Sequence, residues 1–254
     1  MKITFLGTGT STGVPVIGCH CTVCDSTDMH DKRMRSSILW EIDGVRIVID
    51  AGPDFRTQMI QNHIDTIDAI LITHMHYDHV GGLDDVRGFN YSQNIAIDIF
   101  AEQMHADAIK QMLPYVFVQN KYPGVPQIDL HIISEQTFTV KNVNIIPIRV
   151  MHGKMPIFGY RINNWAYITD ASYISPESLN KLKGCDTLII NALRDEEHMS
   201  HFSVKQALAV IESIAPRRAY LTHISHQFGL HSVRNPLLPK GVEMAYDGLI
   251  INEN

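Results

Sequence analysis

The segment Thr73-His74-Met75-His76-Tyr77-Asp78-His79 carries the strongest signal in this 254-residue chain. It follows an apolar run at 69–72, which is typical of a buried strand, and it precedes two glycines that favour a tight turn. In an extended backbone the first two histidines point the same way, and the Asp78-His79 pair follows on the turn. Imidazole nitrogens and carboxylate oxygens bind Zn²⁺ and similar divalent ions, so this segment predicts a metal centre.

Three further candidate ligands stand where other predicted strands end. They are His152 after 144–150, Asp170 after 165–169 and His223 after 219–222. Open α/β sheets place their chemistry where strands exit into loops. Each of these residues alone would more often be structural. Together, beside the first motif, they favour a metal centre over a histidine-rich surface loop.

The composition narrows the function classes. The chain has 21 Lys and Arg against 27 Asp and Glu, a net charge of −6, which is unfavourable for binding nucleic acid by charge alone. No apolar run approaches the roughly 18 residues needed to span a bilayer. The first residues do not resemble a secretion signal, so we expect a cytoplasmic protein whose four cysteines are thiols or metal ligands.

The order of the predicted elements indicates a layered α/β protein. Strands dominate the first third, including a hairpin over 37–49 that turns at Asp43-Gly44, and strands then alternate with helices. Asp54 is expected to cap a helix from 55 to about 62, and Ser203 is expected to cap another. We find no linker, charge block or repeat, so we predict one domain over residues 1–254.

A second cluster lies near the start, in Cys19-His20-Cys21-Thr22-Val23-Cys24. Cysteines at this spacing can place three thiolates around one ion, but they cannot easily form unstrained disulfides with one another. A structural Zn²⁺ needs a fourth ligand, and His226 is our candidate, whereas Cys185 is expected to pack as a small apolar residue. The alternative is a group of reduced thiols. We call residues 19–24 the zinc knuckle.

The His74-x-His76-x-Asp78-His79 pattern resembles the metallo-β-lactamase superfamily of metal-dependent hydrolases, and the later ligands follow in the family's order. The resemblance implies a four-layer αββα sandwich with the metals at one edge. It implies one ion held by His74, His76 and His152, a second held by Asp78, His79 and His223, and Asp170 between both. Asp170 stands where the common antibiotic-cleaving members have a cysteine, an arrangement of the phosphodiesterase and thioester-hydrolase branches.

The implied chemistry is hydrolysis by a hydroxide that bridges two divalent ions, Zn²⁺ or Mn²⁺, with Asp78 in the catalytic set. The leaving alkoxide then needs a proton. Phosphodiesterase members of the superfamily use a histidine in a context similar to that of His201, which we therefore predict to be the proton donor. His198 is the alternative.

The knuckle narrows the resemblance to the PhnP-type phosphodiesterases of phosphonate degradation, which open a cyclic ribosyl phosphate diester. Cys19, Cys21, Cys24 and His226 match their structural zinc site, and the starting stretch 7–15 is similar. The resemblance implies a small phosphodiester as substrate, two active-site metal ions, one structural zinc and a homodimer. Pyrroloquinoline quinone cofactor-biosynthesis (PqqB-like) proteins also have an early cysteine cluster, but they fit the active-site set less well.

Two other enzyme classes share the metal ligands. A tRNA 3′-processing-type endonuclease needs a basic arm, and the obvious candidate, 114–129, contains one lysine (Lys121), one aspartate and several aromatics, so its net charge is zero. We therefore expect no nucleic-acid partner. A glyoxalase II-type thioester hydrolase is the other alternative.

Overall fold

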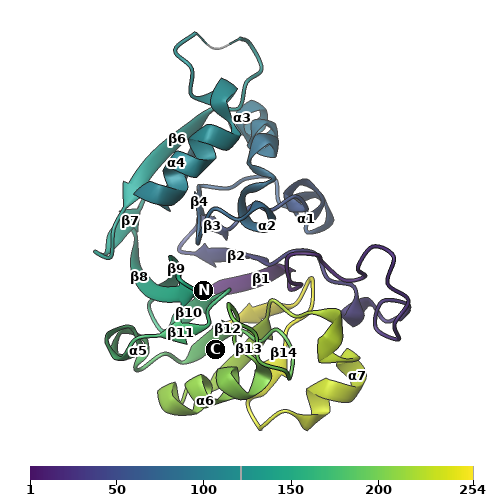
Figure 1. The fold of residues 1–254 in the computed structure, drawn as a ribbon. Coiled ribbons are helices and arrows are strands. Elements are labelled where there is room, and N and C mark those ends of the chain that lie inside the picture. The colour runs from purple at the N-terminus through teal and green to yellow at the C-terminus, as the bar shows by residue number, and fades with distance from the viewer. Residues whose placement is uncertain (121, 254) are drawn as a thin grey trace.

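A computed structural model describes residues 1–120 and 122–253, so Lys121 of the predicted arm lies outside the described residues. Two β-sheets pack face to face, and helices cover both outer sides (Figure 1). This four-layer αββα arrangement confirms the predicted fold. Among the described residues, no helix combines the length and the apolar character that crossing a membrane requires.

Within the described residues, the first sheet contains seven strands in the order β15-β1-β2-β3-β4-β5-β6. Their bounds are β15 (Ile250–Asn252), β1 (Lys2–Gly7), β2 (Ser37–Ile42), β3 (Val45–Ile49), β4 (Ala69–Leu71), β5 (Ile97–Glu102) and β6 (Ile128–Ile133). The antiparallel β2–β3 hairpin turns at Asp43 and Gly44, both at positive φ, as the Asp-Gly pair predicts. From β3 to β6 the strands run parallel.

The second sheet contains eight described strands, in the order β11-β8-β9-β10-β12-β13-β14 with β7 also paired to β8. Their bounds are β7 (Phe138–Val140), β8 (Val143–His152), β9 (Met155–Ile162), β10 (Trp165–Ile168), β11 (Tyr173–Ile174), β12 (Thr187–Asn191), β13 (Arg218–Thr222) and β14 (Val242–Met244). The four strands β10, β12, β13 and β14 are mutually parallel. The carboxyl ends of β10, β12 and β13 therefore lie side by side at the same end of the strands.

The helices are short and connect the strands. Their bounds are α1 (Phe55–Gln61), α2 (Tyr77–Val80), α3 (Arg87–Gln93), α4 (Gln103–Met112), α5 (Pro176–Leu182), α6 (Val204–Ile214) and α7 (His231–Arg234), with 3₁₀ turns η1 (Met29–Asp31), η2 (Leu83–Val86), η3 (Pro114–Val116), η4 (His226–Phe228) and η5 (Asn235–Leu237). Ser203 caps α6 in a reciprocal capping box with Gln206, as predicted. Asp54 makes no side-chain cap on α1, so that expectation was wrong. Its carboxylate instead accepts hydrogen bonds from the backbone N–H and the guanidinium of Arg35.

Three apolar cores hold the layers together. The core between the sheets contains the largest buried side chains, such as Trp40, Tyr160 and Trp165. A second core joins the first sheet to α1, α3 and α4, and a third joins the second sheet to α5 and α6. Burial of this much apolar surface fixes both sheets, and the loops at their shared edge are held on a rigid base.

Candidate metal centre

The first group of candidate ligands contains His74, His76 and His152. One ligand atom from each lies within 4.8 Å of the others. His74 and His76 follow β4, and His152 is the last residue of β8. Burial lowers the pKa of the His74 imidazole well below its usual value, which keeps the ring neutral and able to bind a cation. His74 and His152 are buried while His76 is exposed, so the group opens to solvent on the His76 side.

The second group contains Asp78, His79, Asp170 and His223, again with ligand atoms within 4.8 Å of one another. One oxygen of Asp170 lies 3.3 Å from His79 Nε2, and the other lies 3.0 Å from His223 Nε2. Asp170 also groups with His152, so the two sets of ligands adjoin at this carboxylate.

The charges of the second group suit a bound cation. Burial opposes ionisation of Asp170, but His223 and His79, when protonated, outweigh it and hold the pKa of the carboxyl well below its usual value. A divalent cation would supply the same stabilising charge in place of these two protons. Among the described residues, the buried Nε2 atoms of His79 and His223 approach the Asp170 carboxylate but form no hydrogen bond of good geometry. Buried polar atoms without a partner are costly, and divalent cations would satisfy these nitrogens and the carboxylates together. The donors present therefore fit a pair of divalent metal ions.

The ligands are oriented from behind by Asp50, which is fully buried at the end of β3. Its carboxylate accepts hydrogen bonds from Thr73 N (2.8 Å), Thr73 Oγ1 (2.8 Å) and His79 Nδ1 (2.7 Å). The Thr73 hydroxyl donates to Asp50, so it accepts from His74 Nδ1 at 3.0 Å. Both imidazoles thus carry their proton on Nδ1 and present Nε2 to the centre, the usual role of a carboxylate behind a metal-binding histidine.

Three of these residues adopt a left-handed backbone. Asp50, Asp170 and His223 have φ values of 63°, 57° and 55°, and each lies just after a strand. Each non-glycine residue in such a conformation costs roughly 1–3 kcal/mol. Residues of this kind cluster at functional sites. They turn the chain abruptly at the edge of the sheets, which lets side chains from β3, β10 and β13 converge.

Close glycine contacts seat the turn that carries Asp78 and His79. A Cβ atom on Gly52 would lie 1.9 Å from the carbonyl oxygen of Asp78, and one on Gly82 would lie 2.1 Å from the carbonyl oxygen of Gly52. Two hydrogen bonds add to this contact, from Ala51 N to His79 O and from Gly82 N to Ala51 O. Only glycine permits this approach of the two backbones.

His201, the predicted proton donor, lies beside the ligands. Its ring stacks on His223 at a centroid distance of 4.7 Å, and its Nδ1 lies 3.7 Å from an Asp170 oxygen. Burial, and then the nearby charge of His223, lower the pKa of His201 to about 3. His198 lies one ring further away, 5.1 Å from the centroid of His201, and belongs to no ligand group.

The zinc knuckle forms a separate group. The Nδ1 atom of His226 lies 3.4, 3.3 and 3.6 Å from the sulfurs of Cys19, Cys21 and Cys24. The Cys24 backbone N–H, and then His226, lower the pKa of the Cys21 thiol to about 6, which favours the thiolate that binds zinc. Cys185 is buried in the core between the second sheet and its helices, as expected. Three sulfurs and one imidazole match a structural zinc site.

The structure thus brings together all eleven predicted metal ligands, in the groups that the sequence predicts, and their role as ligands stays a prediction. Sequence reasoning missed two residues that support the ligands. Thr73 orients His74 through its hydroxyl, and Asn191, a fully buried residue at the end of β12, hydrogen-bonds to Ala171 next to Asp170. A signal for Asn191 was present, because it is a polar residue at the end of an apolar strand, as Asp170 is.

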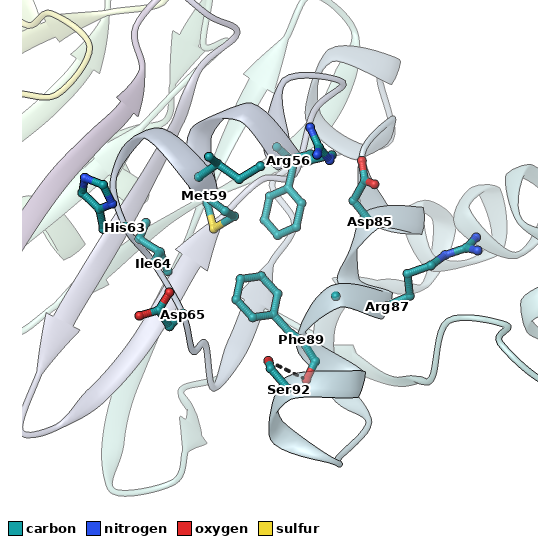
Figure 2. A pocket seen from close by; sticks show the side chains of 12 residues that line it. Arg56, Met59, His63, Ile64, Asp65, Asp85, Arg87, Phe89 and Ser92 are labelled. Carbon is teal, nitrogen blue, oxygen red and sulfur yellow. Dashed lines mark hydrogen bonds between the residues drawn. The ribbon is translucent and has the colours of Figure 1, made fainter.

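A pocket of about 850 Å³ lies away from these ligands, between α1 and α3. Figure 2 shows its apolar floor, which includes Met59 and Phe89, with Arg56 and Asp85 at one end. None of the candidate metal ligands lines it. It is therefore not part of the centre described above.

Comparisons with known proteins agree with this geometry. The model of the beta-lactamase superfamily domain matches residues 45–224. The crystal structure of a diphosphatase from the PhnP family superposes with a TM-score of 0.93 at 37% identity, covering 100% of this chain and 98% of that one.

Two groups of curated relatives are also similar. A Porphyromonas gingivalis protein named octanoyltransferase is 45% identical over 258 residues, which is all of this chain and 52% of that protein. A Prochlorococcus marinus ribonuclease Z is 28% identical over 174 residues, 64% of this chain and 49% of that protein. The chain spans about half the length of the curated relatives that it matches.

Proposed function

This chain belongs to the metallo-β-lactamase superfamily of metal-dependent hydrolases, as a PhnP-type member, and from that membership we propose that it hydrolyses a small phosphodiester with two divalent metal ions. The observation that carries the proposal is the position of Asp170, whose two oxygens face His79 and His223 while the carboxylate also adjoins His152. A carboxylate in that place suits two neighbouring cations.

Seven side chains would hold the ions. His74, His76 and His152 would bind one, Asp78, His79 and His223 the other, and Asp170 both. When bound, two such ions lower the pKa of a coordinated water from about 15.7 toward 7 and neutralise the charge on the phosphate oxygens. Asp50 and Thr73 keep the imidazoles in the tautomer that leaves Nε2 free. We further propose Zn²⁺ or Mn²⁺ in this centre and one structural zinc in the knuckle.

His201 would act on the leaving group. Its ring lies between His223 and His152, at the boundary of the two ligand groups, where the leaving oxygen of a bound diester would lie. The low pKa of about 3 means that the ring is neutral in the free protein at neutral pH. An anionic phosphate bound beside the ring would favour its protonated form, with the proton taken up from solvent as the substrate binds, and the ring would then pass that proton to the departing alkoxide.

Hydrolysis of bis(p-nitrophenyl) phosphate, with and without a chelator, tests the proposal. We expect turnover that a chelator abolishes and that Mn²⁺ or Zn²⁺ restores. A His74→Ala variant should lose the activity while it keeps the knuckle zinc. Turnover that survives both the chelator and this substitution would exclude the dinuclear mechanism, and its complete absence in the metal-loaded protein would exclude the phosphodiester class.

A second substrate class is supported by the PhnP-family structure at 37% identity, which is a diphosphatase. Cleavage of a P–O–P bridge needs the same attack on phosphorus, and its phosphate leaving group is less basic than an alkoxide, so it depends less on a proton donor. A cyclic ribosyl phosphate diester and a dinucleoside diphosphate, compared by kcat/KM, distinguish the two. Precursor tRNA tests the endonuclease alternative, and S-lactoylglutathione tests the thioester alternative, both with the same metal-loaded protein. We expect neither to be hydrolysed.

We do not propose an octanoyltransferase activity for this chain, because the match covers only 52% of the Porphyromonas gingivalis protein of that name. We propose that residues 1–254 act as one domain, since both sheets contribute to one core. We also propose a homodimer, which size-exclusion chromatography with light scattering would test. The cytoplasmic location stays a prediction.

A further inference from the structure

Asn191, at the end of β12, is fully buried, and its side-chain amide hydrogen-bonds to the backbone of Ala171. Its side-chain oxygen accepts from Ala171 N at 2.8 Å, and its Nδ2 donates to Ala171 O at 3.0 Å. The amide thus satisfies both backbone groups of Ala171, as a neighbouring strand would. Ala171 directly follows Asp170, the carboxylate that faces both ligand groups.

The backbone of the same segment reaches the neighbouring strand. Asn191 pairs with Thr222 in the register of β12 and β13, and the N–H of Ala192 donates to Thr222 O at 2.9 Å. Thr222 directly precedes His223. Asn191 therefore holds the Asp170 turn through its side chain and lies opposite Thr222, the residue just before His223.

A third turn joins the same segment. The carbonyl oxygen of Ala171 also accepts from Phe202 N at 2.7 Å, and the N–H of Leu193 donates to Phe202 O at 3.0 Å. Phe202 directly follows His201. The segment 191–193 is therefore hydrogen-bonded to the residues that adjoin Asp170, His223 and His201.

This arrangement explains how two strained turns persist. Asp170 and His223 have φ values of 57° and 55°, and a non-glycine residue keeps such a backbone only where its surroundings enforce it. We propose that Asn191 is a positioning residue of the metal centre, which fixes the Asp170 turn directly and the His201 and His223 turns through the segment 191–193 that it begins. For catalysis, this inference rests on the proposed phosphodiester hydrolysis.

The substitution Asn191→Asp tests the proposal with almost no change of shape. The ionised carboxylate still accepts from Ala171 N, but it cannot donate to Ala171 O and instead places a second oxygen against that carbonyl, so the measurements are made at pH 8, where ionisation is favoured. Removal of hydrogen bonds behind metal ligands typically costs 10–100-fold in metal affinity or activity. The protein keeps its knuckle zinc and is titrated with Mn²⁺. We expect the affinity of the more weakly bound Mn²⁺ ion in the active centre to fall by about 10–100-fold. We expect kcat on bis(p-nitrophenyl) phosphate to fall similarly, with KM within about twofold.

The matched control is Gln58→Glu. Gln58 is also a buried amide that donates to a backbone carbonyl, Arg35 O at 2.9 Å, but it lies on α1 and bonds to none of the three turns. We expect this variant to melt at a lower temperature and to bind Mn²⁺ as the wild type does. Equal losses of Mn²⁺ affinity in both variants would show a general structural effect and would overturn the proposal.

A second variant covers the case in which Asn191→Asp does not fold. Asn191→Ala removes both hydrogen bonds without adding charge. We expect amide hydrogen exchange over 169–173 to become at least about tenfold faster, while 187–190 stays protected. Wild-type exchange there, with wild-type Mn²⁺ affinity, would overturn the proposal. If the wild type hydrolyses no diester, the proposed function fails, but the Mn²⁺ titration and the exchange measurement still test Asn191.

Discussion

Addition of one methyl group at Gly52 should disable the metal centre. A Cβ atom there would lie 1.9 Å from the Asp78 carbonyl oxygen, about 1.5 Å inside the ordinary contact distance. The oxygen is a backbone atom and the Cβ is fixed by the backbone, so neither can rotate away. The turn bearing Asp78 and His79 must therefore shift by more than 1 Å. Overpacking of this kind costs about 1–3 kcal/mol of stability. A 1 Å error in the position of catalytic groups costs about 100-fold in rate.

The assay compares Gly52→Ala with Gly88→Ala. Gly88 lies in α3, and a Cβ there would have no neighbour within 4 Å among residues 1–120 and 122–253. Alanine is favoured over glycine in a helix by up to about 1 kcal/mol, so this control should be as stable as the wild type or slightly more stable. For Gly52→Ala we expect kcat on bis(p-nitrophenyl) phosphate to fall about 100-fold and the content of active-centre metal to fall with it. Wild-type kcat and metal content in Gly52→Ala would refute the argument from backbone contact.

Three further outcomes are expected. His201→Ala should lower kcat by about 100-fold with unchanged metal content, measured by elemental analysis, and unchanged turnover would remove this residue from the mechanism. His226→Ala should lose one zinc per chain and melt at a lower temperature, whereas Gln227→Ala, at the exposed neighbour, should do neither. Burial raises the pKa of the Asp247 carboxyl from 3.8 to about 6, so the folded protein holds this proton more tightly than the unfolded chain. The bound proton therefore stabilises the folded protein. This stabilisation is complete below about pH 4 and is lost as the pH rises through 6, which lowers the free energy of unfolding by up to about 3 kcal/mol. Asp247→Asn should therefore gain stability relative to the wild type between pH 4 and pH 7 in urea unfolding, and a constant difference would contradict this sign.

The ligands could be predicted from the sequence because of where they stand. His152, Asp170 and His223 each follow an apolar run, and the ends of neighbouring strands meet at one edge of a sheet. The structure places them there. The match to the beta-lactamase superfamily model and the PhnP-family structure confirms the family that the histidine motif and the knuckle indicate.

The elements that support the ligands could not be predicted in the same way. The contact between Gly52 and Asp78 joins residues whose approach depends on the packing of two turns, and no spacing in the sequence reports it. The paired bonds between Asn191 and Ala171 depend on strand order, because β12 lies next to β10 only through a parallel crossover.

The most direct test of the central claim is anomalous diffraction from crystals of the metal-loaded protein. We expect two peaks on either side of Asp170, roughly 3.5–4 Å apart, and a third among Cys19, Cys21, Cys24 and His226. A map with the knuckle peak alone, or with a single ion that Asp170 does not contact, would contradict it.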